Sequence, residues 1–145
     1  MLSQLLLASF MALVTTVTHL VGLAILVRVL RSHNHIFAGL KILPLTLLLT
    51  AAIGILAIHT IEIWTYAWLY DGLGCFRGLE DALYFSTVTY ASIGYGDLLL
   101  PHQWRLVGAI EGAVGVIMLG LSTAFLVSLL TRLRLLSHDW LKPAE

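Results

Sequence analysis

The segment 92–97, Ser-Ile-Gly-Tyr-Gly-Asp, has residue types and a spacing that suit ion coordination by the main chain. Its two glycines alternate with bulky residues, and glycine permits backbone angles that are closed to other residues. Such a backbone can point successive carbonyl groups the same way. Because rings of backbone carbonyls can replace the hydration shell of a cation, we expect this segment to line a cation path. The residues concerned are Ser92, Ile93, Gly94, Tyr95 and Gly96.

Two carboxylates, Glu62 and Glu111, lie within segments that are otherwise apolar. Ionisable residues at membrane depth are costly and usually have a function. Glu62 lies about two helical turns before Tyr70, and Glu111 lies about two turns after Trp104. Both carboxylates are therefore expected at a similar depth, where they can support the 92–97 segment through hydrogen bonds. Solvation at the membrane interface remains the alternative. His59 precedes Glu62 by three residues, so we expect a local pair on one helix face.

Small residues form a stripe in the apolar segment 106–130, and such stripes let helices approach closely. The stripe consists of Gly108, Gly112 and Gly115, with Ser122 further along. Gly115 and Gly120 are also candidate gating hinges, at which the expected helix could bend. A hinge and simple helix packing therefore remain two interpretations of these glycines. Further along the same segment, we expect Phe125 and either Leu129 or Leu130 to form a hydrophobic inner constriction.

His33, His35 and Cys75 are three further residues with reactive or ligating side chains. The His-Asn-His pattern can bind a metal, but no cysteine or carboxylate stands nearby, which favours an ordinary loop. A single cysteine cannot form a disulfide within the chain. Cys75 is therefore either a free thiol or half of a disulfide between subunits.

Composition places the chain in a membrane. The 145 residues are 59% hydrophobic, with a mean hydropathy of +0.95 and a formal net charge of zero. A soluble domain has about 45–50% apolar residues, and zero net charge gives no attraction to nucleic acid. Segments 5–30, 43–63 and 106–130 each reach the roughly 20 apolar residues that a membrane helix needs. A signal peptide is disfavoured for the first segment, which lacks a basic start and a cleavage site.

The connection 71–105 contains a short apolar stretch, 81–91, that is too short to span a membrane. Non-helical backbone at membrane depth is tolerated only when it is buried in protein or lines a water-filled path. The connection therefore predicts a re-entrant helix followed by a loop. Lys and Arg gather after the first and third apolar segments, which predicts a cytoplasmic C-terminus, with the N-terminus and this loop outside.

Residues 83–97, with the sequence LYFSTVTYASIGYGD, resemble the pore helix and selectivity filter of potassium channels. The family pattern is a hydroxyl residue, Val or Ile, Gly, Tyr or Phe, Gly and often Asp, and segment 92–97 satisfies each position. The resemblance covers about residues 43–134. It implies that four chains surround one path as a homotetramer and that main-chain carbonyls bind K⁺. Those carbonyls belong to Ser92, Ile93, Gly94 and Tyr95.

The chain departs from the family pattern at two positions. Ser92 stands where the family usually has Thr, which keeps the hydroxyl and loses a methyl group. Val88 stands where some bacterial members have a Glu that couples to the filter aspartate. Asp97 therefore needs another partner, and we expect it to be Tyr84. Support of the filter is thus expected from Asp97, Tyr84 and Val88, with Glu62 and Glu111 behind them.

The expected protein is an all-α membrane protein with three spans, one pore loop and a tetrameric pore. We expect an N-terminal helix and loop at 1–42, a pore domain at 43–134 and a cytoplasmic tail at 135–145. The expected function is passive K⁺ conduction across the cell membrane, with lipid contacts, no cofactor and no enzymatic activity. Two alternatives remain: a non-selective or Na⁺-permeable channel, and a non-conducting assembly subunit. The sequence leaves open the gating stimulus, the conductance and the role of the first span.

Overall fold

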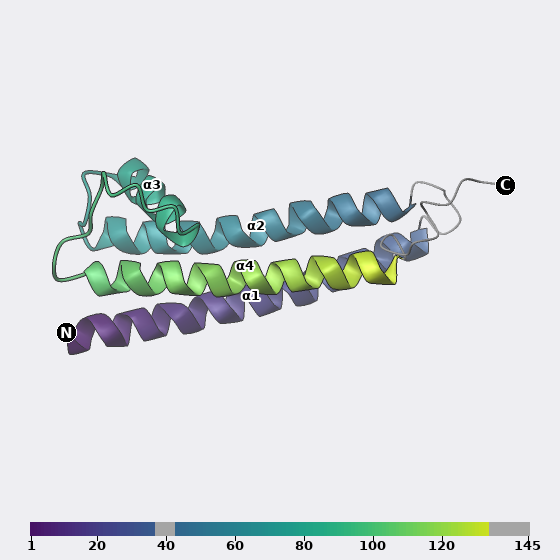
Figure 1. Cartoon of the computed structure of the whole chain (residues 1–145), viewed down its shortest axis with the longest axis horizontal. Helices are drawn as coiled ribbons and strands as arrows, with labels where there is room; N and C mark the ends of the chain where they lie inside the picture. The colour runs from purple at the N-terminus through teal and green to yellow at the C-terminus, as the bar shows by residue number, and fades with distance from the viewer. Residues whose placement is uncertain (37–42, 134–145) are drawn as a thin grey trace.

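The computed structural model describes residues 1–36 and 43–133, which contain three long helices and one short helix. The helices are α1 (Leu2–Ile36), α2 (Leu43–Gly72), α3 (Leu79–Tyr90) and α4 (Arg105–Arg132). The long helices lie side by side, and α3 packs at the end of the bundle where the N-terminus also lies (Figure 1). α1 contacts α2 and α4, and α3 contacts the same two helices.

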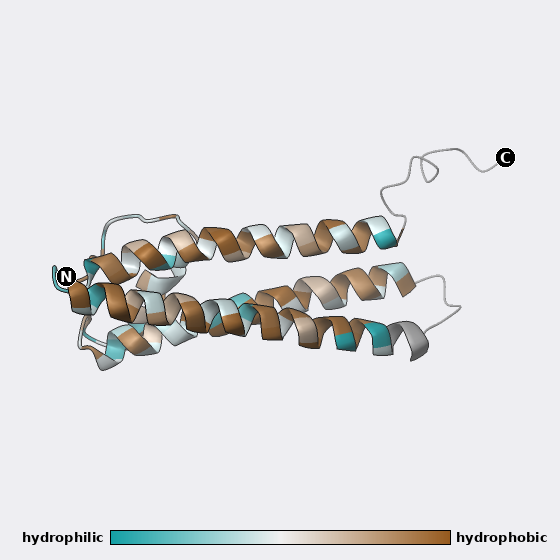
Figure 2. Ribbon diagram, turned by 90° about the horizontal axis from the view of Figure 1, so that it is seen from below, coloured by the Kyte–Doolittle hydropathy of each residue, from teal (hydrophilic) through white to brown (hydrophobic). Residues whose placement is uncertain are grey.

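All three long helices are long and apolar enough to cross a membrane, over Leu2–Ser32, Leu43–Gly72 and Arg105–Arg132. Figure 2 shows hydrophobic residues along their whole length. The three predicted spans are therefore confirmed as helices with the composition of a multi-pass membrane protein. Because no face of these helices is consistently polar, lipid or further protein must cover their outer surfaces.

One predicted boundary differs from the structure. α1 continues to Ile36, so the backbone of His33 and His35 belongs to a helix end, not to a loop as predicted. α2 continues from its apolar part through the aromatic stretch 64–70, as the sequence predicts, and ends at Gly72. The expected tail at 135–145 and most of the loop that ends at residue 42 lie outside the described residues, as do the side chains of both histidines.

Glycines bring α1 and α2 close together. A Cβ atom placed on Gly22 would lie 2.7 Å from Cγ1 of Ile58, and one on Gly54 would lie 2.5 Å from Cδ1 of Leu26. A large side chain of each helix therefore packs over a glycine of the other: Ile58 over Gly22, and Leu26 over Gly54. Such small-residue contacts hold helices together within a membrane, where burial from water gives little driving force.

The predicted glycine stripe of α4 faces α3. A Cβ atom on Gly112 would lie 3.3 Å from the carbonyl oxygen of Thr89, and one on Gly115 would lie 2.1 Å from that of Tyr90. The latter distance is far below van der Waals contact. Gly115 therefore lets the C-terminal end of α3 rest directly on the α4 backbone, and this contact positions the loop that follows.

Candidate ion-coordinating loop

The loop after α3 has an alternating backbone. Ser92, Gly94 and Gly96 have φ angles of 57°, 56° and 77°, whereas Ile93 and Tyr95 between them stay at negative φ. Left-handed angles cost glycine little, but a non-glycine residue in this region is uncommon. Ser92 is the one such residue in the described part of the chain. A regular β-strand keeps negative φ angles throughout, so this segment is not a regular strand.

The loop is fixed to the end of α3 by main-chain hydrogen bonds. The carbonyl of Val88 accepts from the N–H groups of both Ile93, at 2.8 Å, and Gly94, at 3.1 Å. The N–H of Ser92 donates to the carbonyl of Thr89 at 2.9 Å. Carbonyls at the end of a helix lack helical partners, and here the loop supplies them. Val88 thus contacts the loop through its backbone.

Several groups of the loop face away from the rest of the chain. The side chains of Ile93 and Tyr95 are 53% and 69% exposed, so nothing in this single chain packs against most of their surface. The Ser92 hydroxyl lies 3.4 Å from the carbonyl oxygen of Gly112 on α4. A hydrogen bond of this length is weak, so the Ser92 hydroxyl can still interact with another group.

Tyr84 and Asp97 form the hydrogen bond that the sequence predicted. The Tyr84 hydroxyl donates to Oδ2 of Asp97 at 2.7 Å, which links α3 to the far end of the loop. This bond holds the pKa of Asp97 below its ordinary value, because it stabilises the carboxylate. The same bond raises the pKa of Tyr84. Both groups are therefore held in the charge states that form the bond, a carboxylate and a neutral phenol.

Glu111 is fully buried between three helices. Its carboxylate lies 2.6 Å from the hydroxyl of Tyr70 on α2 and 2.6 Å from that of Ser86 on α3. A buried carboxylate without partners would be strongly destabilising, and these hydroxyls provide them. The side chain therefore joins α2, α3 and α4 directly behind the short helix.

Glu62 is also buried, and its partners come from three helices. One carboxylate oxygen lies 3.1 Å from Nδ1 of His19 on α1. The other lies 3.2 Å from Nδ1 of His59, so the local pair predicted from the three-residue spacing is present. Tyr90, the last residue of α3, donates its hydroxyl to the same oxygen. Glu62 therefore connects the first helix to the residue from which the loop departs.

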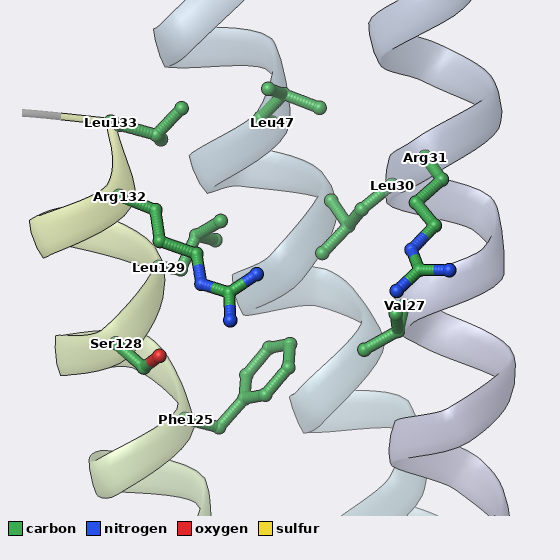
Figure 3. Close-up of a pocket in the computed structure, with 9 residues that line it drawn as sticks. All are labelled: Val27, Leu30, Arg31, Leu47, Phe125, Ser128, Leu129, Arg132 and Leu133. Carbon is green, nitrogen blue, oxygen red and sulfur yellow. The ribbon is translucent and has the colours of Figure 1, made fainter.

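The two candidate hinges have different surroundings. Gly115 lies against the Tyr90 carbonyl, as described above, whereas a Cβ atom on Gly120 would meet nothing within 4 Å. Phe125 and Leu129 extend from α4 into a pocket between the helices, where they face Leu30 and Leu47 (Figure 3). In this chain, these two residues thus pack towards α1 and α2.

Cys75 follows α2 and is a half-buried free thiol. Burial raises the pKa of this thiol above its ordinary value. The thiolate, which is the reactive form, is therefore less populated than in an exposed cysteine. A disulfide with another subunit stays a prediction.

Sequence reasoning missed most of the partners of the two carboxylates. It gave no role to His19, Tyr70 or Ser86, and it noted Ser122 only as a small residue. One signal was available for His19, because an ionisable residue within a membrane span usually has a partner there. The hydroxyl residues carry no comparable signal.

Comparison with known protein families gives a match over more than half of the chain. A family model described as an ion channel, Ion_trans_2, matches residues 45–132. The chain belongs to this ion-channel family. The resemblance of residues 83–97 to pore-loop channels is therefore confirmed at the level of the family. No curated protein and no solved structure matches the chain.

The ion-channel match begins in α2 and ends at the last residue of α4. It thus includes α3 and the loop with the alternating backbone, and it leaves α1 outside. Membership of this family points to a channel. α1 is accordingly an addition to the channel domain, joined to it by His19 and by the glycine contacts with α2.

Proposed function

We propose that the chain is one subunit of a homotetrameric, potassium-selective channel that conducts K⁺ passively across the cell membrane. One observation carries this proposal: positive φ angles at Ser92, Gly94 and Gly96 alternate with negative ones in a loop fixed to the end of α3. This alternation suits a backbone whose carbonyls all face one side. α3 is then the re-entrant pore helix, and segment 92–97 is the filter.

Four such loops around a central axis would form successive rings of carbonyl oxygens. Each ring replaces water around a K⁺ ion, and several rings in series let incoming ions displace bound ones. Five extended residues span about 16 Å, enough for a row of sites. The proposed ligands are the carbonyls of Ser92, Ile93, Gly94 and Tyr95, with the Ser92 hydroxyl as a further oxygen. No other cofactor is needed for passive conduction.

Several features of the chain support this arrangement. The exposed side chains of Ile93 and Tyr95 would be buried by neighbouring subunits behind the filter. α3 ends beside the loop, so its partial negative charge favours a cation there. Glu62 and Glu111 anchor α3 through Tyr90 and Ser86. Lys and Arg near the helix ends favour an external filter and N-terminus and a cytoplasmic C-terminus.

Gly94→Ala tests the proposal in liposomes. Within the chain, a Cβ atom on Gly94 meets nothing within 4 Å, but its φ of 56° is unfavourable for alanine. We expect the variant to lose K⁺-selective flux, because the loop must leave its alternating conformation. Gly72→Ala is the matched control, since Gly72 also has an open surrounding but no positive φ. Unchanged K⁺ selectivity in purified Gly94→Ala protein would contradict the proposal.

A further inference from the structure

The buried cluster around Glu62 has the composition of a metal site. His19 on α1 and His59 and Glu62 on α2 are each at most 8% exposed. Each offers one ligand atom, and these atoms lie within 4.8 Å of one another. Two imidazoles and a carboxylate form a common ligand set for zinc and related divalent metals. None of these three side chains is among the proposed K⁺ ligands.

The ring nitrogens of both histidines face buried oxygen atoms. Nδ1 of each ring faces the Glu62 carboxylate, at 3.1 Å for His19 and 3.2 Å for His59. The Nε2 atoms lie 3.0 Å (His59) and 3.4 Å (His19) from the hydroxyl oxygen of Ser122. The two Nδ1 atoms and the carboxylate therefore face one another, and Ser122 lies at the other side of both rings.

A bound cation suits this arrangement. A divalent metal between the Nδ1 atoms and the carboxylate would leave the ring hydrogens on Nε2. Ser122 could then accept both N–H groups, since a hydroxyl oxygen has two lone pairs. Metal-bound histidines usually donate their second ring N–H to such a partner.

We propose that His19, His59 and Glu62 bind one divalent transition metal ion of the zinc class in each subunit. Ser122 on α4 orients the two imidazoles, and the Tyr90 hydroxyl, 3.0 Å from Nδ1 of His59, is a further oxygen beside the site. The metal would join α1 to the channel domain and contact the residue that ends α3. This site is independent of which ion the channel conducts.

The rival occupant is a proton. One extra proton, shared between His19 and Glu62, would also fit between these side chains and needs no metal. The two occupants differ in stoichiometry and spectrum, so binding of Co²⁺ as a spectroscopic substitute for Zn²⁺ separates them. The protein must carry no histidine tag and must first be dialysed against a chelator.

Titration of the wild-type protein with Co²⁺ is the deciding experiment. We expect one Co²⁺ per chain, the visible absorption bands of a four-coordinate ion, displacement by Zn²⁺, and X-ray absorption fine structure with two imidazole ligands. Added Zn²⁺ should also raise the melting temperature, because ligands of the folded state stabilise it. Absence of the bands, together with no effect of Zn²⁺ on melting, would overturn the proposal in favour of the proton.

Variants locate the ion. His19→Gln and Glu62→Gln should each abolish the Co²⁺ bands, and Ser122→Ala should weaken binding roughly 10-fold or more. His102→Gln is the matched control, since His102 is an exposed histidine that contacts Arg105 and is not part of the cluster, and the variant should bind Co²⁺ as the wild type does. Bands that persist in both His19→Gln and Glu62→Gln would place the ion elsewhere and contradict the assignment.

Discussion

The hydrogen bond from Tyr84 to Asp97 closes the loop at its outer end, and its pH dependence follows from the two pKa shifts. The pKa of Asp97 is lowered, chiefly by the Tyr84 hydroxyl. The bond therefore contributes stability above the ordinary aspartate pKa of about 3.9. That contribution is lost as the pH falls through the lowered pKa, because protonation removes the charged acceptor. Between that pH and the raised pKa of Tyr84, the bond is intact.

Tyr84→Phe should raise the pKa of Asp97 towards its ordinary value. Backbone N–H groups still face the carboxylate in the variant, so part of the shift should remain. An NMR pH titration of the Asp97 carboxyl carbon, in wild type and in Tyr84→Phe, measures this difference. An equal or lower pKa in the variant would show that the Tyr84 hydroxyl does not stabilise the carboxylate.

At the scale of single residues, some backbone angles and side-chain partners could be predicted from the sequence and others could not. The glycines at positions 94 and 96 predicted positive φ angles there, because few other residues adopt such angles. The positive φ of Ser92 had no such signal, since serine usually avoids that region. Tyr84 could be identified as the partner of Asp97 because Val88 removed the usual acidic partner. The other partners of Glu62, His19 and Tyr90, could not be predicted, because they depend on how the helices are rotated against one another, which one sequence does not contain.

At the scale of elements, the C-terminal end of α3 is held between α2 and α4 by two kinds of contact. Carboxylates bind its hydroxyl groups, and Gly115 admits its last carbonyl against the α4 backbone. The existence of all four helices could be predicted from apolar length and glycine content. The face that each presents to its neighbours could not, because helices that are apolar all round have no distinct buried side.

Gly115→Ala should destabilise the packing of α3 on α4. A Cβ atom would lie 2.1 Å from the Tyr90 carbonyl oxygen, so backbone must move. Overpacking of this kind costs about 1–3 kcal/mol, and we expect a lower melting temperature in detergent.

Gly120→Ala is the matched control for this prediction. It adds a methyl group to the same helix in open space, and alanine is favoured over glycine there by about 1 kcal/mol. Its melting temperature should be unchanged or higher. Equal melting temperatures for Gly115→Ala and Gly120→Ala would contradict the close contact and would favour a hinge role for Gly115.

At the scale of the whole molecule, a single chain has only one side of the proposed ion path. Its loop leaves Tyr95 69% exposed and Ile93 53% exposed, although both are large and apolar or aromatic. Exposed residues of this kind at the end of a membrane bundle indicate a missing protein neighbour. A closed assembly of identical chains is the simplest neighbour, because most oligomers are symmetric.

Native mass spectrometry of protein released from detergent micelles should therefore show a homotetramer. The assembly should survive reduction, since the proposed contacts need no disulfide through Cys75. A mass limited to the monomer or dimer would contradict the tetramer and would favour a non-conducting assembly subunit.

The central claim is selectivity for K⁺, and the reversal potential of the purified wild-type channel tests it most directly. Planar bilayers with K⁺ on one side and Na⁺ on the other, at equal concentration, separate the two ions by the sign and size of the zero-current voltage. We predict a large reversal potential of the sign that K⁺ permeation requires. A reversal potential near zero would identify a non-selective cation channel, and one of opposite sign a Na⁺ channel; either would contradict the account.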